Sequence, residues 1–210
     1  MPFKTTFRIL SASMLDGILI KNYSAPPVDE REILRYAGLR GEADAQTKAI
    51  LDECLAECAP RLSYRVCCRE LPKSHPLFQT GTGVRQRLAA CDGVVVFAAT
   101  VGLELDRLIA KYARISVAKA LLLQAVGTER IESLCDEFCK TLAGEYPSKK
   151  FLPRFSPGYG DFPLTAQKEL VALLDCPRKI GITLNDSLLM TPTKSVTAAI
   201  GFKTETEDGF

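Results

Sequence analysis

The heptapeptide Arg154-Phe155-Ser156-Pro157-Gly158-Tyr159-Gly160 is the most informative stretch of the chain. Its arginine carries a planar fork of donors that fits a carboxylate in bidentate fashion. Pro157-Gly158 favours a tight turn in which the glycine can adopt a positive φ, and Tyr159 adds a ring face and a hydroxyl. A small ligand with both a carboxylate and a cationic centre would suit this combination. A surface loop with Arg154 packed over Tyr159 is the simpler alternative.

Apolar patterns on both sides of this motif predict a mixture of helices and strands. Downstream, Pro163 begins a helix to about Leu174, and strands are expected over 180–184 and 195–200. Upstream, the apolar run 94–99 has the length of a buried strand. Helices are expected over 103–112 and 116–143, the second with a bend at Gly127, and residues 144–162 are expected to form a loop.

The first 70 residues predict two further helices and a strand. Asp29 is an N-cap with Glu32 at capping-box spacing, which opens a helix to Tyr36. A second helix is expected over 44–59, ended by Pro60. Apolar residues then alternate with Arg61, Arg65 and Arg69, as in a half-buried strand with a basic outer face. A short strand is also expected over 6–10. Uneven spacing of helices and strands favours the α+β class.

Composition excludes several kinds of protein. The 210 residues have a net charge of +2 and no basic stripe, which argues against nucleic-acid binding. No apolar run reaches the length of about 18 residues that a membrane-spanning helix needs, and the chain start lacks the pattern of a signal peptide. We therefore expect a cytoplasmic protein without membrane association.

Cysteine and histidine usage predicts no metal site and no nucleophile–base pair. Eight cysteines are present without any C-x-x-C spacing, and His75 is the single histidine. Reduced thiols packed in the core account for this pattern. Gly81-Thr82-Gly83 lacks the third glycine of a dinucleotide fingerprint, and Thr100-Val101-Gly102 is interpreted as a connecting turn.

The motif Arg154-x-x-Pro157-Gly158-Tyr159 also carries a family resemblance. Together with the later segment 179–192 (KIGITLNDSLLMTP), it resembles the end of the activation domain of cobalamin-dependent methionine synthase. The segments 94–102 and 128–138 follow that domain's order and spacing. The resemblance covers roughly residues 88–202. It implies an α+β fold with a twisted antiparallel sheet and flanking helices.

The resemblance further implies a division of the chain. Residues 1–87 form an N-terminal part that matches only loosely, 88–202 form the activation-domain-like core, and 203–210 form a tail, all within one compact domain. The family's domain continues beyond its final Ser-Val strand with an aromatic-rich segment that contacts the ligand. Here a short polar tail follows Phe202, so part of the adenosyl pocket is expected to be absent.

Site residues are implied by the same resemblance. Arg154 would grip the carboxylate of S-adenosylmethionine, and Ser156, Pro157, Gly158 and Tyr159 would line its pocket. Glu137 would face the positively charged end of the ligand, although a solvated helix carboxylate is an equal interpretation of this residue. The candidates for a further acidic contact are Asp29, Glu30 and Asp44. No side chain is expected to act as a catalytic acid, base or nucleophile.

In function, the resemblance implies an S-adenosylmethionine-binding activation subunit. It would support reductive methylation of the inactive cob(II)alamin of a methionine synthase that lacks this module, as an accessory part rather than a stand-alone enzyme. Cobalamin would reside on the partner, because the surroundings of His75 do not fit the Asp-x-His-x-x-Gly loop of a corrinoid carrier. A flavodoxin or ferredoxin-type reductant would donate the electron.

Two other functions remain open at this point. The first is a non-catalytic docking or regulatory module for a corrinoid methyltransferase. The second is an independent methyltransferase that acts on a small nucleophile, which is disfavoured because the chain has no glycine-rich strand-to-helix turn of the Rossmann type.

Overall fold

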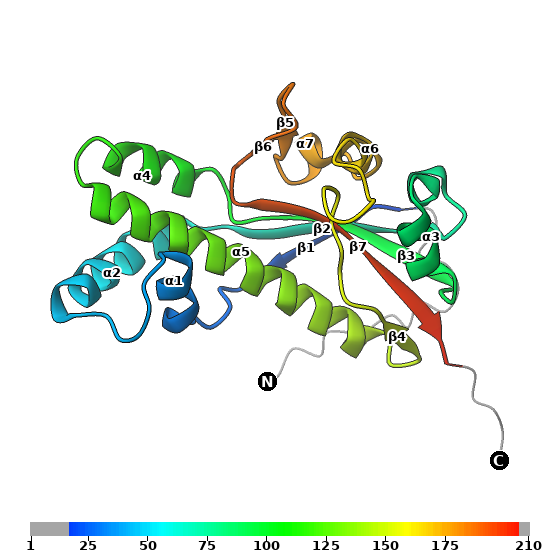
Figure 1. Cartoon of the computed structure of the whole chain (residues 1–210), viewed down its shortest axis with the longest axis horizontal. Coiled ribbons are helices and arrows are strands. Elements are labelled where there is room, and N and C mark those ends of the chain that lie inside the picture. The colour runs from blue at the N-terminus through cyan, green and yellow to red at the C-terminus, as the bar shows by residue number, and fades with distance from the viewer. Residues whose placement is uncertain (1–16, 206–210) are drawn as a thin grey trace, which may run out of the picture.

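The main sheet is antiparallel and has five strands in the order β1-β2-β3-β7-β4 (Figure 1). It is seen in a computed structural model that describes residues 17–205. β5 and β6 form a separate small sheet. The strands are β1 Leu19–Tyr23, β2 Tyr64–Pro72, β3 Gly93–Thr100, β4 Lys149–Phe151, β5 Thr183–Leu184, β6 Met190–Thr191 and β7 Ser195–Thr204. The predicted α+β fold with a twisted antiparallel sheet is confirmed, while the strand expected over 6–10 lies outside the described residues.

Helices cover both faces of this sheet. Figure 1 shows α1, α2 and the long α5 on one face and α6 and α7 on the other. The α-helices are α1 Glu30–Tyr36, α2 Ala45–Cys58, α3 Thr82–Leu88, α4 Glu104–Tyr112, α5 Val117–Glu145, α6 Ala166–Leu173 and α7 Cys176–Lys179. Two 3-10 turns, η1 Ala59–Arg61 and η2 Pro76–Gln79, complete the described helical elements. The result is a three-layer arrangement with one hydrophobic core on each side of the sheet.

Strand β3 separates the two cores. All eight of its residues are buried, as the continuous apolar run predicts. Phe97 points to the α5 side, where its ring centroid lies 4.7 Å from that of Phe138. Val94 and Val96 point to the opposite core beneath α6 and α7. Successive side chains of a strand alternate between faces, so an all-apolar strand requires cover on both faces.

The outer face of β2 differs from its prediction. It was expected to be basic and solvated, but Cys67 is fully buried on it, with its Sγ 3.9 Å from the Sγ of Cys176 at the start of α7. Arg65 and Arg69 are half-buried on the same face. The prediction fails because long basic side chains can pack their aliphatic stems beneath a covering element while the sequence pattern registers only their charge.

Gly127 has a different role from the predicted bend. Helix α5 continues through it from Val117 to Glu145. A Cβ at position 127 would lie 2.6 Å from Leu105 Cδ2 and 2.8 Å from Lys194 Cγ. The glycine therefore permits close packing of α4 and of Lys194, the residue before β7, against α5.

Segment boundaries after residue 144 are shifted from their predictions. The expected loop contains β4, in which Phe151 pairs with Phe202 of β7. Helix α6 begins at Ala166, after a turn in which the Ala166 N–H donates to the Pro163 carbonyl. Only Thr183 and Leu184 of the expected strand over 180–184 are extended and paired. Strand β7 is longer than expected, because it continues to Thr204.

The cysteines are free thiols, and all except Cys139 are buried. Burial raises the pKa of Cys54 and of Cys58 to about 11 and that of Cys68 to about 12. These thiols act as small apolar side chains in the core. Between residues 17 and 205, no helix has the combination of length and apolarity that crossing a membrane requires.

Candidate functional site

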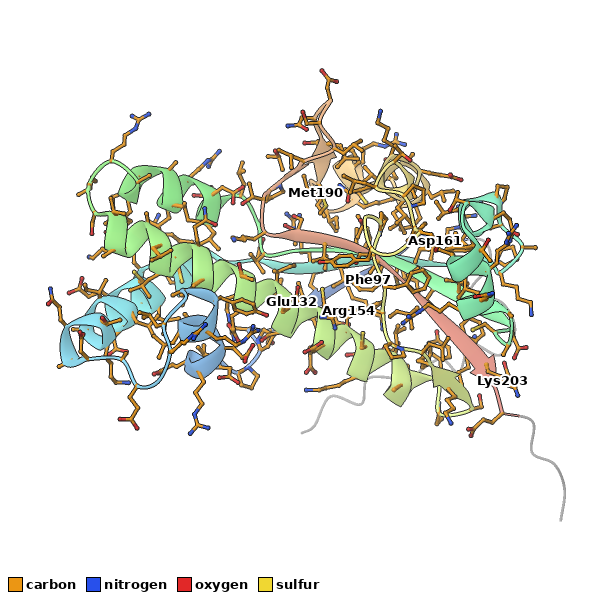
Figure 2. The ribbon with its side chains drawn as sticks, in the orientation of Figure 1. Phe97, Glu132, Arg154, Asp161, Met190 and Lys203 are labelled. Carbon is orange, nitrogen blue, oxygen red and sulfur yellow. The ribbon has the colours of Figure 1, made fainter. Side chains whose placement is uncertain are left out.

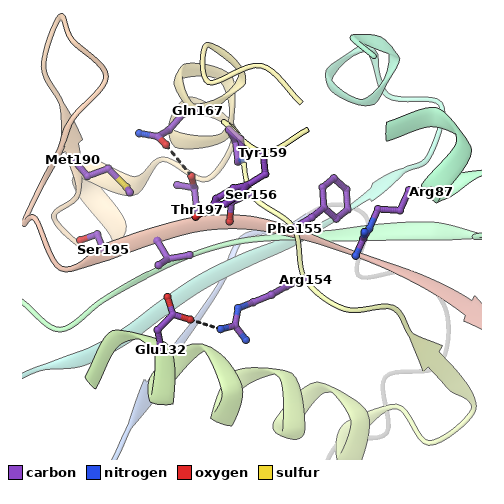
Figure 3. Close-up of a pocket in the computed structure, with 12 residues that line it drawn as sticks. Arg87, Glu132, Arg154, Phe155, Ser156, Tyr159, Gln167, Met190, Ser195 and Thr197 are labelled. Carbon is purple, nitrogen blue, oxygen red and sulfur yellow. Dashed lines mark hydrogen bonds and ion pairs between the residues drawn. The ribbon is translucent and has the colours of Figure 1, made fainter. Parts of the chain in front are cut away.

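A cavity of about 520 Å³ opens at the sheet edge where the 154–160 segment passes β7 (Figure 3). Helix α5 borders it on one side and α6 on the other. Four of the residues predicted for ligand binding line this cavity, namely Arg154, Ser156, Pro157 and Tyr159. The structure thus gathers most of the predicted motif around one hollow.

The motif is anchored to β7 directly after Arg154. Phe155 N–H donates to the Ala199 carbonyl at 2.9 Å, and Ala199 N–H donates to the Phe155 carbonyl at 2.8 Å. The turn that follows is closed by Gly158 N–H, which donates to the Phe162 carbonyl at 2.8 Å. Gly158 has φ +93°, a conformation that favours glycine. This predicted residue shapes the turn without lining the cavity.

Arg154 points from this segment towards Glu132 of α5 (Figures 2 and 3). Its Nη2 lies 2.5 Å from Glu132 Oε2, and its Nη1 pairs with Asp136. Burial lowers the pKa of the Arg154 guanidinium, but the hydrogen bond to Asp136 and the nearby charges outweigh burial and raise it overall. These two bonds leave further donors on the five-donor fork, so the guanidinium can accept an additional anionic partner.

Glu137 does not share this cavity. It lines a second hollow, and its Oε2 lies 4.0 Å from Lys140 Nζ. Residues four apart lie on one face of a helix, which places Glu132 and Asp136 together opposite Arg154. Glu137 is one residue, about 100°, further round the helix. Glu137 thus lies on the same helix as Glu132 but lines the second hollow and not the Arg154 cavity.

The second hollow has a volume of about 740 Å³ and lies beyond the Arg154 ion pairs, since Asp136 belongs to its lining. Asp29 and Glu30 also line it. Asp44 has another role, because its side chain accepts from Thr47 N–H at 2.7 Å and caps α2. Two of the three acidic candidates from the N-terminal part thus lie in the hollow of Glu137.

A buried ion pair that sequence reasoning missed holds the wall of the second hollow. Arg130 Nε lies 2.5 Å from Glu129 Oε2, and the two side chains are only 2% and 3% exposed. Arg130 also donates to the carbonyls of Pro26 and Pro27, at 2.6 and 2.7 Å. Asp29 N–H donates to Glu129 Oε1 at 3.1 Å. The pair therefore fastens the segment before α1 to helix α5.

Neutral polar side chains form the end of the first cavity furthest from Arg154 along β7. Gln167, Ser195 and Thr197 are 5%, 7% and 2% exposed. Gln167 Nε2 donates to the Leu188 carbonyl at 2.7 Å, and Thr197 Oγ1 lies 3.5 Å from Gln167 Oε1. These residues were also missed. The two-residue spacing of Ser195 and Thr197 on a predicted strand was the one available signal.

Asp161 explains the Gly81-Thr82-Gly83 motif. Its carboxylate accepts from Gly83 N–H at 2.6 Å and from Val84 N–H at 3.1 Å. It thereby caps α3 from the loop that follows Tyr159, as its position in Figure 2 shows. A Cβ on Gly81 would lie 2.5 Å from the Asp161 carboxylate, and one on Gly83 would lie 2.9 Å from it. The glycines permit this approach, so the motif is structural.

Replacing Asp161 tests this cap. Asp161→Ala is expected to lower the free energy of unfolding by about 0.5–2 kcal/mol, because the two N–H groups lose their acceptor. Asp161→Asn keeps one of the two acceptor oxygens, so its stability should lie between those of the parent and of Asp161→Ala. Denaturant unfolding monitored by circular dichroism would measure both changes. An Asp161→Ala protein as stable as the parent would contradict the assigned role.

The effect of Gly83→Ala on stability is expected to depend on the residue at position 161. Gly83→Ala is expected to destabilise the parent, since the new Cβ meets the Asp161 carboxylate. In the Asp161→Ala protein the same change should be neutral or stabilising, because alanine is preferred over glycine within helices by about 1 kcal/mol. Additive effects in this double-mutant cycle would show that the two residues do not interact.

Comparisons with known proteins agree with this architecture. Residues 84–208 match the family model described as vitamin B12 dependent methionine synthase, activation domain. Among solved structures, the chain is similar to the MetH reactivation domain bound to AdoHcy, with a TM-score of 0.65 and 15% sequence identity. That match covers 92% of this chain and 80% of the other, and at this identity it bears on the fold alone. No curated protein sequence matches the chain.

The sequence motif, the fold and the family model thus point to one conclusion. The matched residues include α5, the Arg154 segment, α6 and β7, which all line the cavity. The predicted resemblance is confirmed. The chain belongs to the family of vitamin B12 dependent methionine synthase activation domains.

Proposed function

We propose that this protein binds S-adenosylmethionine in the Arg154 cavity and presents its methyl group to the cobalamin of a methionine synthase on another chain. The observation that carries the proposal is Arg154, which lines a cavity at the sheet edge with Glu132 beside it. Membership of the activation-domain family supports the proposal, as does the AdoHcy bound to the similar reactivation domain.

The charges in the cavity match the two ends of such a ligand. The carboxylate of the ligand would accept from the Arg154 fork. Its ammonium or sulfonium would lie near Glu132, since an opposite charge lowers the cost of burying either group. We therefore assign to Glu132 the part that the resemblance gave to Glu137. Ser156 and Pro157 would contact the middle of the ligand, and Tyr159, which is 76% exposed, would form the rim.

Methyl transfer from a sulfonium requires no acid or base from this chain. The bond between the methyl carbon and sulfur breaks, the sulfur keeps its electron pair, and S-adenosylhomocysteine remains in the cavity. The protein contributes orientation and exclusion of water. The cobalt that receives the methyl group must first be reduced by one electron, for which we propose a flavodoxin or ferredoxin-type donor.

A second candidate is a docking or regulatory module for a corrinoid methyltransferase that does not use S-adenosylmethionine. The ion pairs of Arg154 favour it, because Glu132 and Asp136 already neutralise the guanidinium without a ligand. Retained binding to a corrinoid protein without affinity for S-adenosylmethionine would distinguish this candidate from the first.

Calorimetric titration with S-adenosylmethionine and S-adenosylhomocysteine tests the proposal. Saturable binding at one site per chain is expected for both ligands, and absence of binding for both would overturn the methyl-donor role. Glu137→Gln is the matched control, because this carboxylate lies in the second hollow. Its affinity should stay within about threefold of the parent. Reactivation of a cob(II)alamin methionine synthase would be the following assay.

A further inference from the structure

Two cysteines from distant parts of the chain meet in the core beneath α6 and α7. Cys67 lies in β2 and Cys176 is the first residue of α7, and their Sγ atoms are 3.9 Å apart. Both side chains are fully buried. All eight cysteines lie within residues 17–205, and no other two of them have Sγ atoms in contact. A disulfide requires that this separation decrease from 3.9 Å to about 2.05 Å.

The two thiols belong to elements that differ in how firmly they are held. Cys67 lies within a nine-residue strand that pairs with β1 on one side and β3 on the other. Helix α7 has only four residues, and the three that follow Cys176 are exposed. Asp175, directly before the helix, has φ +47°, a left-handed conformation that strains a residue other than glycine. Cys176 can therefore approach Cys67, or reach solvent, through a local movement of α7.

The surroundings of the two thiols do not indicate a metal site. In the part of the chain that the structure describes, no group of three or more His, Cys, Asp or Glu side chains could hold a metal ion. The neighbouring thiol of Cys68 belongs to the opposite core, on the α5 side of the sheet. The methyl transfer proposed above uses none of these thiols. The contact between Cys67 and Cys176 is thus a dithiol without an assigned role.

We propose that Cys67 and Cys176 form a redox modification site, at which a peroxide converts the two thiols into a disulfide that fastens α7 to β2. The inference is independent of the proposed function. Cys176 reacts first, because α7 is the element that can move to admit the oxidant. Its sulfur attacks one peroxide oxygen, the O–O bond breaks, and a sulfenic acid and water form. The Cys67 sulfur then attacks the Cys176 sulfur, the S–O bond breaks, and a second water leaves. Two thiols are oxidised by two electrons, and hydrogen peroxide is reduced to water.

The position of this disulfide connects it with the Arg154 cavity. Helix α7 lies between α6, whose Gln167 lines the cavity, and β6, whose Met190 also lines it. Figure 1 shows α6 and α7 on the same face of the sheet. A covalent bond from α7 to β2 ties this wall of the cavity to the sheet. Cys67 and Cys176 are 109 positions apart, and a cross-link over so long a loop strongly restricts the unfolded chain.

Oxidation of the purified protein with hydrogen peroxide tests the proposal. Cys139, which is not fully buried, is replaced by serine in every protein compared, so that its own oxidation does not interfere. The number of free thiols, counted after denaturation, is expected to fall by two. Digestion without reductant should yield one peptide pair linked through Cys67 and Cys176. The thermal midpoint should rise by at least about 4 °C, and dithiothreitol should reverse each change.

Cys68→Ala is the matched control, because Cys68 is fully buried beside Cys67 but belongs to the opposite core. This variant should still form the disulfide, whereas Cys67→Ala should form none at Cys176. Cys176→Ala replaces Cys67→Ala if that protein does not fold. Cys67 and Cys176 that both stay reduced in peroxide would overturn the proposal. A disulfide formed only between other cysteines would overturn it as well.

Discussion

Arg154→Ala is expected to weaken binding of S-adenosylmethionine by at least about 100-fold. The guanidinium lines the cavity and pairs with Glu132. Its removal leaves the ligand carboxylate without its partner and next to two like charges. Losing one partner of a hydrogen-bonded charge pair costs about 2–5 kcal/mol, and each tenfold in affinity corresponds to about 1.4 kcal/mol. Calorimetric titration would measure the change.

The substitution should leave the protein folded. Glu132 and Asp136 are 41% and 59% exposed, so water can solvate both carboxylates once Arg154 is gone. Arg154→Lys tests geometry, because an ammonium retains the charge without the planar fork. It should recover only part of the affinity. Arg178→Ala removes an 85% exposed arginine with its own acidic partner and serves as the control. Unchanged affinity in Arg154→Ala would place the ligand elsewhere.

Glu129→Ala is expected to lower the free energy of unfolding by about 3–5 kcal/mol, the largest stability change that we predict. The alanine leaves the Arg130 guanidinium, which is 2% exposed, without its carboxylate. Breaking one side of a buried ion pair is much more costly than replacing both sides. Loss of the acceptor for Asp29 N–H and Ser133 Oγ adds to the effect. Denaturant unfolding at neutral pH is the measurement.

Two comparisons separate this effect from a general loss of helix charge. Glu137→Ala removes a solvated carboxylate from the same helix and should change stability by less than about 0.5 kcal/mol. The double substitution of Glu129 to Leu and Arg130 to Met should be less destabilising than Glu129→Ala alone. Recovery would be partial, because Arg130 also satisfies the carbonyls of Pro26 and Pro27. A double variant that is less stable than Glu129→Ala would contradict the ion-pair explanation.

Local rules predicted much of the fold because the deciding interactions are local. Asp29 caps α1 through Arg31 N–H and Glu32 N–H, and Ser116 accepts from Lys119 N–H at the start of α5. Both caps depend on residues within one turn. The buried strand β3 follows from its continuous apolar run. By contrast, the pairing of β4 with Phe202 depends on a partner far along the chain, and its three residues show no alternation.

The candidate site was predicted in part for the same reason. Arg154 and the turn after it form a contiguous motif, and their cavity could be anticipated. The carboxylate partner of Arg154 could not be anticipated. Glu132 and Glu137 lie on different faces of the same helix, and the resemblance does not show which face lies opposite Arg154. From the sequence alone, Glu129 and Arg130 would be interpreted as solvated charges, because their burial depends on contacts with residues far along the chain. Gln167 had no distinguishing pattern at all.

Arg154 and its two carboxylate partners lie in parts of the fold that are held with different rigidity. Glu132 and Asp136 lie within α5, a 29-residue helix with many buried side chains. Arg154 lies in an irregular segment held to β7 by the Leu152 N–H, which donates to the Gly201 carbonyl, and by an isolated bridge at Phe155. Amide hydrogens of the helix should therefore exchange slowly, and those of Arg154 and Ser156, which have no acceptor among residues 17–205, should exchange faster. Opening of these ion pairs is therefore expected to move the segment and leave the acidic helix in place.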